Sequence, residues 1–233
     1  MTSDSEAERI KREYARRDRE IPDRFYGWER PANLLAHQEV AQEGIRQLCQ
    51  AGHFPLTGRR VLDVGCGSAS WLLEFVQWGA NPIDLAGIDL IAERIETAKA
   101  RIPSADLLLG PATALPWPDG SFDVVSQFTV FTSILAADVK RLCAAEMLRV
   151  LKPGGLVLWY DFRFNNPRNS QVKGIGQREL RSLFAPCSVS LTTITLAPPI
   201  ARLVAPRSWL LALMLRKIPI LCSHYLAVIR KPS

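Results

Sequence analysis

The chain has 233 residues, of which 48% are hydrophobic and 22% are charged, a composition typical of a globular domain large enough to bury a core. The charged first twenty residues lack the apolar stretch of a secretory signal, and no window reaches the roughly 18 consecutive apolar residues of a membrane span. Five scattered cysteines without a CxxC pair, together with only three histidines, argue against a disulfide framework and a metal site. We therefore expect no bound metal and a location in the reducing cytoplasm.

The net charge of +6 is unevenly distributed. Residues 1–31 carry eight acids and eight bases, and residues 32–162 carry fourteen acids and ten bases. Residues 163–233 carry eleven bases and one acid, a net charge of +10. This basic segment is either an ordinary solvated surface or the neighbourhood of an anionic substrate, a lipid headgroup or a nucleic acid.

The predicted elements alternate between helices and strands in the middle of the chain. Helices are predicted over residues 4–20, 32–51, 69–78, 91–100, 138–151, 177–184 and 208–216, with Asp138 as an N-cap. Strands are predicted over residues 60–64, 84–89, 106–109, 122–128, 156–160, 188–196 and 223–230. Strands separated by helices indicate parallel βαβ units. The last two strands have no full crossover between them, which favours an antiparallel pair at the edge.

A glycine-rich turn follows the first of these strands. The stretch from Val61 to Ser68 runs from aliphatic residues directly into Gly65-Cys66-Gly67, and glycines allow both a tight turn and close approach of a ligand. The third glycine of a dinucleotide fingerprint is replaced by Ser70, which weakens an NAD or FAD interpretation. Asp63 lies at the strand end, where its carboxylate suits an ammonium or sulfonium group better than a pyrophosphate.

A second acid, Asp89, ends the next strand 22 residues after Gly67. A carboxylate at that place can accept hydrogen bonds from ribose hydroxyls. The alternative is an ordinary surface aspartate that ends a strand.

Two further segments, 110–125 and 148–155, follow the glycine turn and the strand that ends at Asp89. Together they make four sequence motifs in a fixed order. With them the chain resembles the class I S-adenosylmethionine-dependent methyltransferases, in particular the small-molecule branch of the methyltransferase type 11 kind, over about residues 60–160. The resemblance implies an α/β fold: a Rossmann-like seven-stranded, mostly parallel sheet with an antiparallel C-terminal strand and helices on both faces. It divides the chain into an N-terminal helical arm or lid, 1–58, and a methyltransferase domain, 59–233, with a helical insert at about 198–221.

The resemblance also implies S-adenosylmethionine as the cofactor and a role for each matching residue. Gly65 and Gly67 would pass under its methionine part, which Asp63 would orient. Asp89 would hold the ribose, and Leu90 would pack on the adenine. The adenine edge would meet Ala112 and Thr113, and the methionine side would be lined by Gln127 and Phe128. The family often has aspartate where this chain has Pro111, so adenine recognition here must rely on nearby backbone atoms.

Candidates for a catalytic base are few. Asp161 follows the fifth predicted strand, at the edge where ligands bind in open α/β sheets, and its alternative role is to cap a loop. His37 reaches the site only if the N-terminal helix folds over it, and is otherwise a packed or surface histidine. Tyr26 and Trp28 are candidates for a lid over the cofactor, or for simple packing of the arm.

The chemical class of the methyl acceptor is inferred from the segment 198–221, which is apolar with interspersed arginines and a lysine. It would form a hydrophobic lid for a lipid-like or isoprenoid acceptor, an interfacial helix on an anionic membrane, a helix packed on the sheet edge, or a dimer contact. Our leading hypothesis is a cytoplasmic enzyme that methylates a lipid-like or anionic small molecule. It would be a monomer or a homodimer, and in one version it would bind the membrane peripherally.

One alternative is an RNA or protein methyltransferase, but this chain has no basic run interleaved with aromatics. The other is a non-catalytic cofactor-binding module.

Overall fold

The structure is a computed structural model that describes residues 3–21, 25, 27, 29–166 and 169–232. The strands are β1 Val61–Val64, β2 Leu85–Asp89, β3 Asp106–Leu109, β4 Phe122–Phe128, β5 Leu151–Phe162, β6 Ser188–Leu196 and β7 Cys222–Arg230. The α-helices are α1 Ser3–Glu20, α2 Pro31–Ala51, α3 Ser70–Gln77, α4 Ala92–Arg101, α5 Ala137–Val150, α6 Gln177–Leu183, α7 Pro198–Val204 and α8 Trp209–Leu215. Short 3₁₀ turns are η2 Pro82–Asp84, η3 Phe131–Ser133 and η4 Pro219–Leu221.

The seven strands form one sheet in the order β3-β2-β1-β4-β5-β7-β6. The pairs from β3 to β5 are parallel, and β7 lies antiparallel between β5 and β6. The order reverses at β1, so the carboxyl ends of β1 and β4 flank a topological switch point, where open α/β sheets bind ligands. The predicted fold, mostly parallel with an antiparallel last strand, is confirmed.

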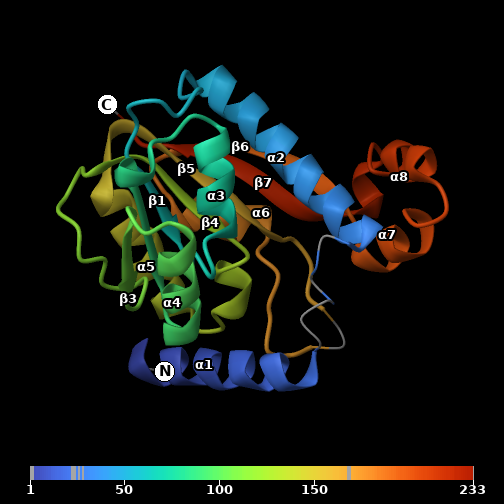
Figure 1. Cartoon of the computed structure of the whole chain (residues 1–233), viewed down its shortest axis with the longest axis horizontal. Helices are drawn as coiled ribbons and strands as arrows, with labels where there is room; N and C mark the ends of the chain where they lie inside the picture. The colour runs from blue at the N-terminus through green and yellow to red at the C-terminus, as the bar shows by residue number, and fades with distance from the viewer. Residues whose placement is uncertain (1–2, 22–24, 26, 28, 167–168, 233) are drawn as a thin grey trace.

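Alternating strand residues supply a core on each face of the sheet, as the two-residue period of a strand requires. Val61, Val124 and Leu158 pack with α2, α3 and α4 on one face. Leu62 and Trp159 pack with α5 and α6 on the other. Both faces of the sheet are therefore covered by helices (Figure 1).

Two local expectations were wrong. Asp138 is not the N-cap of α5: Ala136 takes that position without a side-chain cap, and the Asp138 carboxylate instead bonds Arg141 one turn later. The fifth strand begins at Leu151 rather than residue 156, because Leu151 already pairs with Phe122 before a bulge. Gly154 adopts a positive φ of 72° within this strand, so the glycines bend the strand instead of preceding it.

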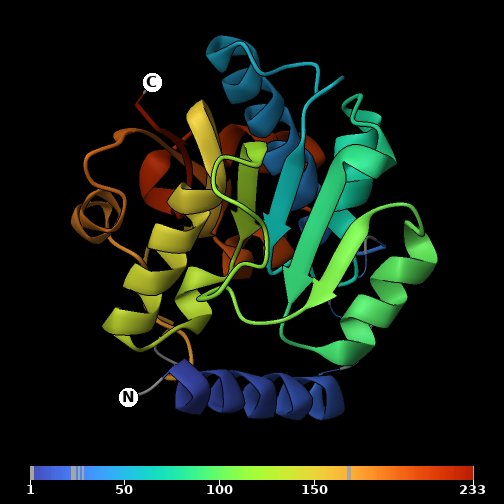
Figure 2. The same ribbon diagram turned by 90° about the vertical axis from the view of Figure 1, so that its left-hand side faces the viewer.

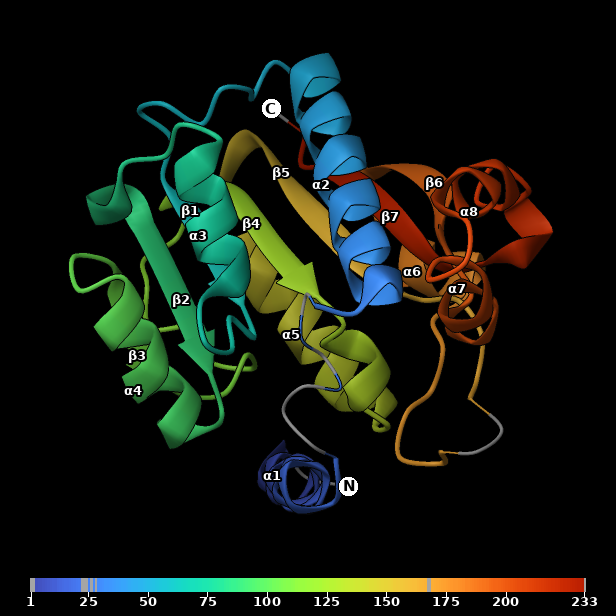
Figure 3. The same cartoon turned by 45° about the vertical axis from the view of Figure 1, so that its right-hand side comes forward.

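The two helical additions lie at different edges of the sheet. Figure 2 shows α1 lying across the ends toward which the strand arrows point. Figure 3 shows α7 and α8 at the opposite side from β3, beyond β6. Among the helices in the described part of the chain, none combines the length and apolarity needed to cross a bilayer.

Candidate active site

An open cavity lies at the carboxyl ends of β1, β2 and β4; the space in it is about 870 Å³ when the adjoining open solvent is included. Its walls come from the glycine turn, the end of β2, the loop after β3, the loop after β4, and α1 and α5. The lining residues are Ser3, Glu6, Ala7, Ile10, Tyr14, Gly65, Ile88, Asp89, Leu90, Ile91, Arg94, Gly110, Pro111, Ala112, Thr113, Phe128, Thr129, Val130, Ser133, Ile134, Val139 and Cys143. Six of the nine predicted cofactor residues are in this wall: Gly65, Asp89, Leu90, Ala112, Thr113 and Phe128.

The glycine turn after β1 has the conformation that its residues predict. Gly65 and Gly67 both have positive φ, 73° and 52°, which side chains rarely adopt. A Cβ on Gly65 would lie 2.3 Å from Val130 Cγ2, so this position also requires glycine for space. A Cβ on Gly67 would have no atom within 4 Å, so its backbone borders open space rather than packed protein.

Asp89 connects this turn to the end of β2. One carboxylate oxygen accepts a hydrogen bond from the Gly67 amide at 2.9 Å, and the other accepts one from the Ile91 amide at 3.0 Å. Burial raises the pKa of Asp89 above the usual carboxyl range, and these amide bonds partly offset that effect. Asp89 is therefore a positioned acceptor in the cavity wall, suited to hydroxyl donors.

Asp63 lies one layer behind the wall. It pairs with Ser126 across β1 and β4, and the Ser126 hydroxyl donates to its carboxylate at 2.7 Å. Burial raises the pKa of Asp63 to about 7, against the lowering effect of this bond; the charge of Asp89 raises it further. As placed, Asp63 supports the turn from beneath rather than lining the cavity.

The loop after β3 forms a second wall. Leu90, Pro111 and Ala112 are neighbouring contributors of apolar surface to the cavity lining. Thr113 closes its edge, where its hydroxyl is 3.0 Å from that of Ser3 on α1. An aromatic base fits against such a surface.

The end of β4 supplies one residue to the cavity and one behind it. Phe128 lines the cavity and stacks on Trp71 with ring centroids 4.0 Å apart. Gln127 is fully buried: its amide nitrogen donates to the Tyr160 carbonyl at 3.1 Å, and its amide oxygen accepts from the Val130 amide at 2.9 Å. Gln127 thus holds the loop after β4 in shape without facing the cavity.

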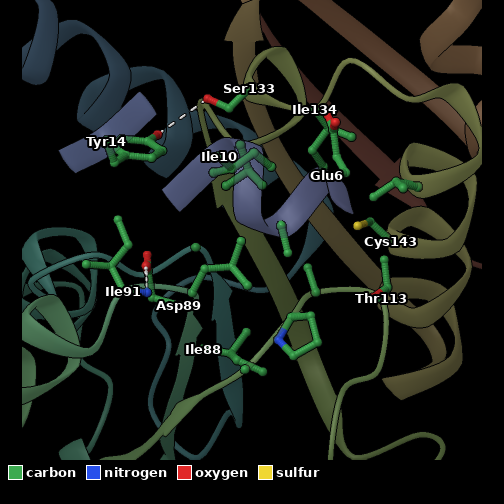
Figure 4. A pocket seen from close by; sticks show the side chains of 18 of the residues that line it. Glu6, Ile10, Tyr14, Ile88, Asp89, Ile91, Thr113, Ser133, Ile134 and Cys143 are labelled. Carbon is green, nitrogen blue, oxygen red and sulfur yellow. Dashed lines mark hydrogen bonds between the residues drawn. The ribbon is translucent and has the colours of Figure 1, made fainter. Parts of the chain in front are cut away.

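Residues 1–58 were expected to form an arm or lid, but the particular residues of α1 that line the cavity were not predicted. Glu6, Ile10 and Tyr14 recur every four residues, so they share one helix face, and Figure 4 shows them across the cavity from Asp89 and Thr113. The signal in the sequence is the pair of apolar residues at this spacing in an otherwise charged helix. The Tyr14 hydroxyl lies 3.4 Å from that of Ser133.

Glu6 anchors this helix. Its carboxylate is fully buried and accepts hydrogen bonds from the backbone amides of Leu135 and Ala136. Arg9 donates to both carboxylate oxygens, at 3.0 and 2.9 Å, and also to the side chain of Gln171 at 3.0 Å. Burial acts to raise the pKa of Glu6, but the bonds from Arg9 and Leu135 outweigh it and leave the pKa below its usual value.

The two candidate bases lie outside the cavity. Asp161 is fully buried and accepts bonds from the Thr132 amide, the Thr132 hydroxyl and the Phe162 amide. His37 Nε2 lies 3.1 Å from the Glu74 carboxylate. Neither is among the lining residues. Tyr26 and Trp28, the predicted aromatic lid, lie outside the described residues.

S-adenosylmethionine fits what these walls offer. Its adenine matches the apolar lining at Leu90 and Ala112, and its ribose hydroxyls match the Asp89 carboxylate. The open backbone at Gly67 leaves room for the methionine chain. The phenyl face of Phe128 suits a sulfonium cation.

Comparison with known proteins agrees with this geometry. Residues 62–159 match the family model described as "Methyltransferase domain". The chain is 34% identical over 145 residues to a phthiotriol/phenolphthiotriol dimycocerosates methyltransferase of Mycobacterium ulcerans, covering 57% of this chain and 51% of that one. It is 35% identical over 105 residues to a demethylmenaquinone methyltransferase of Renibacterium salmoninarum, covering 45% and 42%. The chain thus spans about half the length of these curated relatives.

A solved methyltransferase structure has a fold similar to that of this chain. An S-adenosylmethionine-dependent methyltransferase from Mesorhizobium loti superposes with a TM-score of 0.60 at 14% identity, covering 82% of this chain and 98% of that one. The four ordered signatures, the sheet order and the matched segment agree. Over residues 62–159 this chain is similar to the methyltransferase domain family, and it shares its fold with S-adenosylmethionine-dependent methyltransferases.

Proposed function

We propose that this protein transfers the methyl group of S-adenosylmethionine to a small, lipid-like acceptor. The observation that carries the proposal is the cavity at the switch point, whose lining combines the Asp89 carboxylate with apolar residues such as Leu90 and Ile134. Bound there, S-adenosylmethionine would supply a methyl group on a sulfonium: the acceptor would form a bond to the methyl carbon as the carbon–sulfur bond breaks, and the neutral thioether would leave. The protein's own task is to hold donor and acceptor in line, which can lower the activation free energy by roughly 7–11 kcal/mol.

The cofactor side of the proposal assigns each residue a part. Asp89 accepts the ribose hydroxyls, Leu90 and Ala112 enclose the adenine, and Thr113 borders its edge. The backbone of Gly65 and Gly67 passes beneath the methionine chain. Asp63 and Gln127 enter as supports of this wall, since their side chains bond to Ser126 and to the loop after β4.

The acceptor side is supported by the apolar character of the remaining walls. Ile10 of α1, Ile134 and Val139 line the same cavity as Asp89, and an apolar wall favours a ligand with hydrocarbon or ring surface. The matched relatives are named for a phthiotriol lipid and for demethylmenaquinone. Both names favour an acceptor of that general kind.

The helix α1 acts as a lid in this proposal. It supplies five of the lining residues, and its anchor is the buried Glu6. Residues 1–58 are thus proposed as an arm whose first helix covers the cofactor while α2 packs against the sheet. Opening of α1 admits the cofactor, and closing excludes water from the reaction.

Neither Asp161 nor His37 acts as a catalytic base in this reaction, because neither side chain lines the cavity. Asp161 enters as a positioning residue, because its bonds to Thr132 fix η3 and hence Ser133 in the cavity wall. His37 enters only as a packing residue of α2. An acceptor that is itself a good nucleophile needs only placement.

Two measurements on the purified protein test the proposal. Calorimetry should detect S-adenosylmethionine binding, and Asp89→Ala should weaken it at least tenfold, while Glu96→Ala on the exposed face of α4 should not. Incubation of a cell extract with methyl-labelled cofactor should place the label in the organic-solvent fraction. Label found only in RNA or in protein would replace the lipid-like acceptor with a macromolecule, and a failure to bind the cofactor would refute the whole proposal.

A further inference from the structure

We propose that the outer face of the insert 198–221 docks the protein on the surface of an anionic lipid bilayer. We call this face the insert surface: the exposed apolar residues Leu203, Leu210, Leu211, Met214, Ile218 and Ile220, with the basic residues Arg202, Arg207, Arg216 and Lys217. The inference goes beyond the proposed function, because cofactor binding makes no use of this face.

The apolar part of the insert surface is large and unusually exposed. Leu210 is 70% exposed, Met214 61% and Ile220 79%. Leu210, Leu211 and Met214 are spaced so that they share one face of α8, while Ala212 is fully buried. Contiguous exposed apolar side chains on this scale mark an interaction site rather than an ordinary surface.

The inner face of the insert already has its partners. Ala201, Ala205 and Ala212 pack in a cluster with Ala32 and Leu35 at the start of α2. The small side chains let α7 and α8 lie close to α2. Several larger apolar residues of the insert also pack on this cluster, namely Ile200, Val204, Trp209, Leu213, Leu215 and Leu221, whereas those of the insert surface are exposed. Figures 1 and 3 show both helices projecting beyond the β6 edge of the sheet, so a flat surface can approach them.

The charge around the insert surface identifies its partner. Arg202, Arg207 and Lys217 are exposed and Arg216 is half-buried, and the chain has no acid after Glu179. Glu39, a carboxylate that interacts electrostatically with Arg216 and Lys217, is buried, so its charge does not lie on the exposed face. Apolar side chains surrounded by cations are the pattern of interfacial segments on anionic lipid.

The same charge disfavours a second copy of this chain as the partner. In a two-fold dimer the same patch meets itself, so the four cations of one copy would face the four of the other. Like charges brought together in this way disfavour association. An anionic bilayer instead offers hydrocarbon to the leucines and phosphates to the arginines.

A neighbouring loop extends the surface toward the cavity side. Arg163 donates to the carbonyl of Pro219 in η4 at 3.4 Å, and its guanidinium lies 4.3 Å from the ring of Phe164. Phe164 is 54% exposed, which gives the membrane one aromatic contact beside the insert.

Co-sedimentation with lipid vesicles tests the proposal on the full chain. The protein should sediment with vesicles of mixed phosphatidylcholine and phosphatidylglycerol, should stay in solution with phosphatidylcholine alone, and should be released by salt. The double variant Leu210→Gln/Met214→Gln should bind at least tenfold more weakly, since it loses two apolar side chains from the interface. Arg207→Gln/Lys217→Gln should bind about thirtyfold more weakly, at roughly 1 kcal/mol for each charge.

Matched controls separate docking from folding and from cofactor binding. Ile83→Gln alters a side chain with the same 70% exposure as Leu210 at another edge of the molecule, and it should bind vesicles like the parent. All variants should retain S-adenosylmethionine affinity by calorimetry. If the parent ignores anionic vesicles, or if the insert variants bind them unchanged, the docking proposal is refuted even where cofactor binding is intact. A dimer abolished by Leu210→Gln/Met214→Gln, without vesicle binding, would replace the bilayer with a second copy.

Discussion

The carboxylate of Glu6 accepts a hydrogen bond from the backbone amide of Leu135, 129 residues further along the chain. This amide lies just before α5, whose N-cap Ala136 has no side-chain acceptor of its own. A negative charge is favourable near the N-terminus of a helix. Glu6 therefore fixes α1 over the cavity and also stabilises the start of α5.

Replacement of Glu6 with glutamine should loosen α1. The amide cannot accept all the donors of Arg9 and Leu135, and a buried donor without a partner costs about 1–3 kcal/mol. Hydrogen exchange of the α1 amides should accelerate, and S-adenosylmethionine should dissociate about tenfold faster. Glu8→Gln, on the exposed side of the same helix, is the control. Equal exchange rates in the two variants would show that Glu6 does not hold the lid.

Asp161 should give the folded protein a measurable pH dependence. Burial raises its pKa to about 7, although three donors from Thr132 and Phe162 lower it. The folded state thus binds a proton that the unfolded chain releases near pH ~4. Its contribution to stability is complete below that pH and is lost as the pH rises toward about 7.

The variant Asp161→Asn removes this titration. The free energy of unfolding, measured by urea denaturation across that pH range, should fall less steeply with pH than in the parent, and Asp63 should supply the residual slope because its pKa is also raised to about 7. The exposed Asp138→Asn should keep the parent's slope. Identical slopes in all three proteins would contradict the raised pKa of Asp161.

Pro111 is expected to limit the affinity for the adenine. It lines the cavity, and its side chain offers no hydrogen-bond acceptor. Pro111→Asp should tighten S-adenosylmethionine binding by about tenfold through one additional hydrogen bond to a charged group. Pro111→Ala controls for the lost ring. Calorimetry showing no gain for aspartate over alanine would place the adenine elsewhere.

His37 should be dispensable for catalysis. Its Nε2 lies 3.1 Å from Glu74, and its ring lies 4.9 Å from that of Trp71, so its contacts are those of helix packing. His37→Gln should lower stability by about 1 kcal/mol and keep turnover within a factor of about three. A hundredfold loss of turnover with unchanged melting would restore His37 as a catalytic residue.

The strand ends of the site could be predicted because their signals are local. Gly65 and Gly67 directly follow a β-branched strand, and Asp89 ends the next one. The parallel order then brings these residues to one edge. The same reliance on local signals gave a wrong N-cap at Asp138 and a wrong start for β5. The Asp138 carboxylate accepts a hydrogen bond from Arg141 one turn later, and Leu151 already pairs with Phe122 of β4 before the glycines.

The other side of the site depends on contacts that leave no local pattern. Glu6 is one of eight acids in the first 31 residues, and only tertiary packing distinguishes it from its exposed neighbours. Asp161 stands at the expected strand end, but Thr132 approaches from η3 and encloses its carboxylate. Position along a strand therefore indicates where a side chain begins, and the packing of distant segments decides whether it reaches the cavity.

The segment between β5 and α6 touches both additions to the domain. Gln171 accepts a bond from Arg9 of α1, and Arg163 donates to Pro219 beside the insert. The described parts of this segment, 163–166 and 169–176, thus contact α1 beside the cavity and the insert beside the sheet edge. A substitution in this segment would therefore affect both the cover of the cavity and the proposed docking surface.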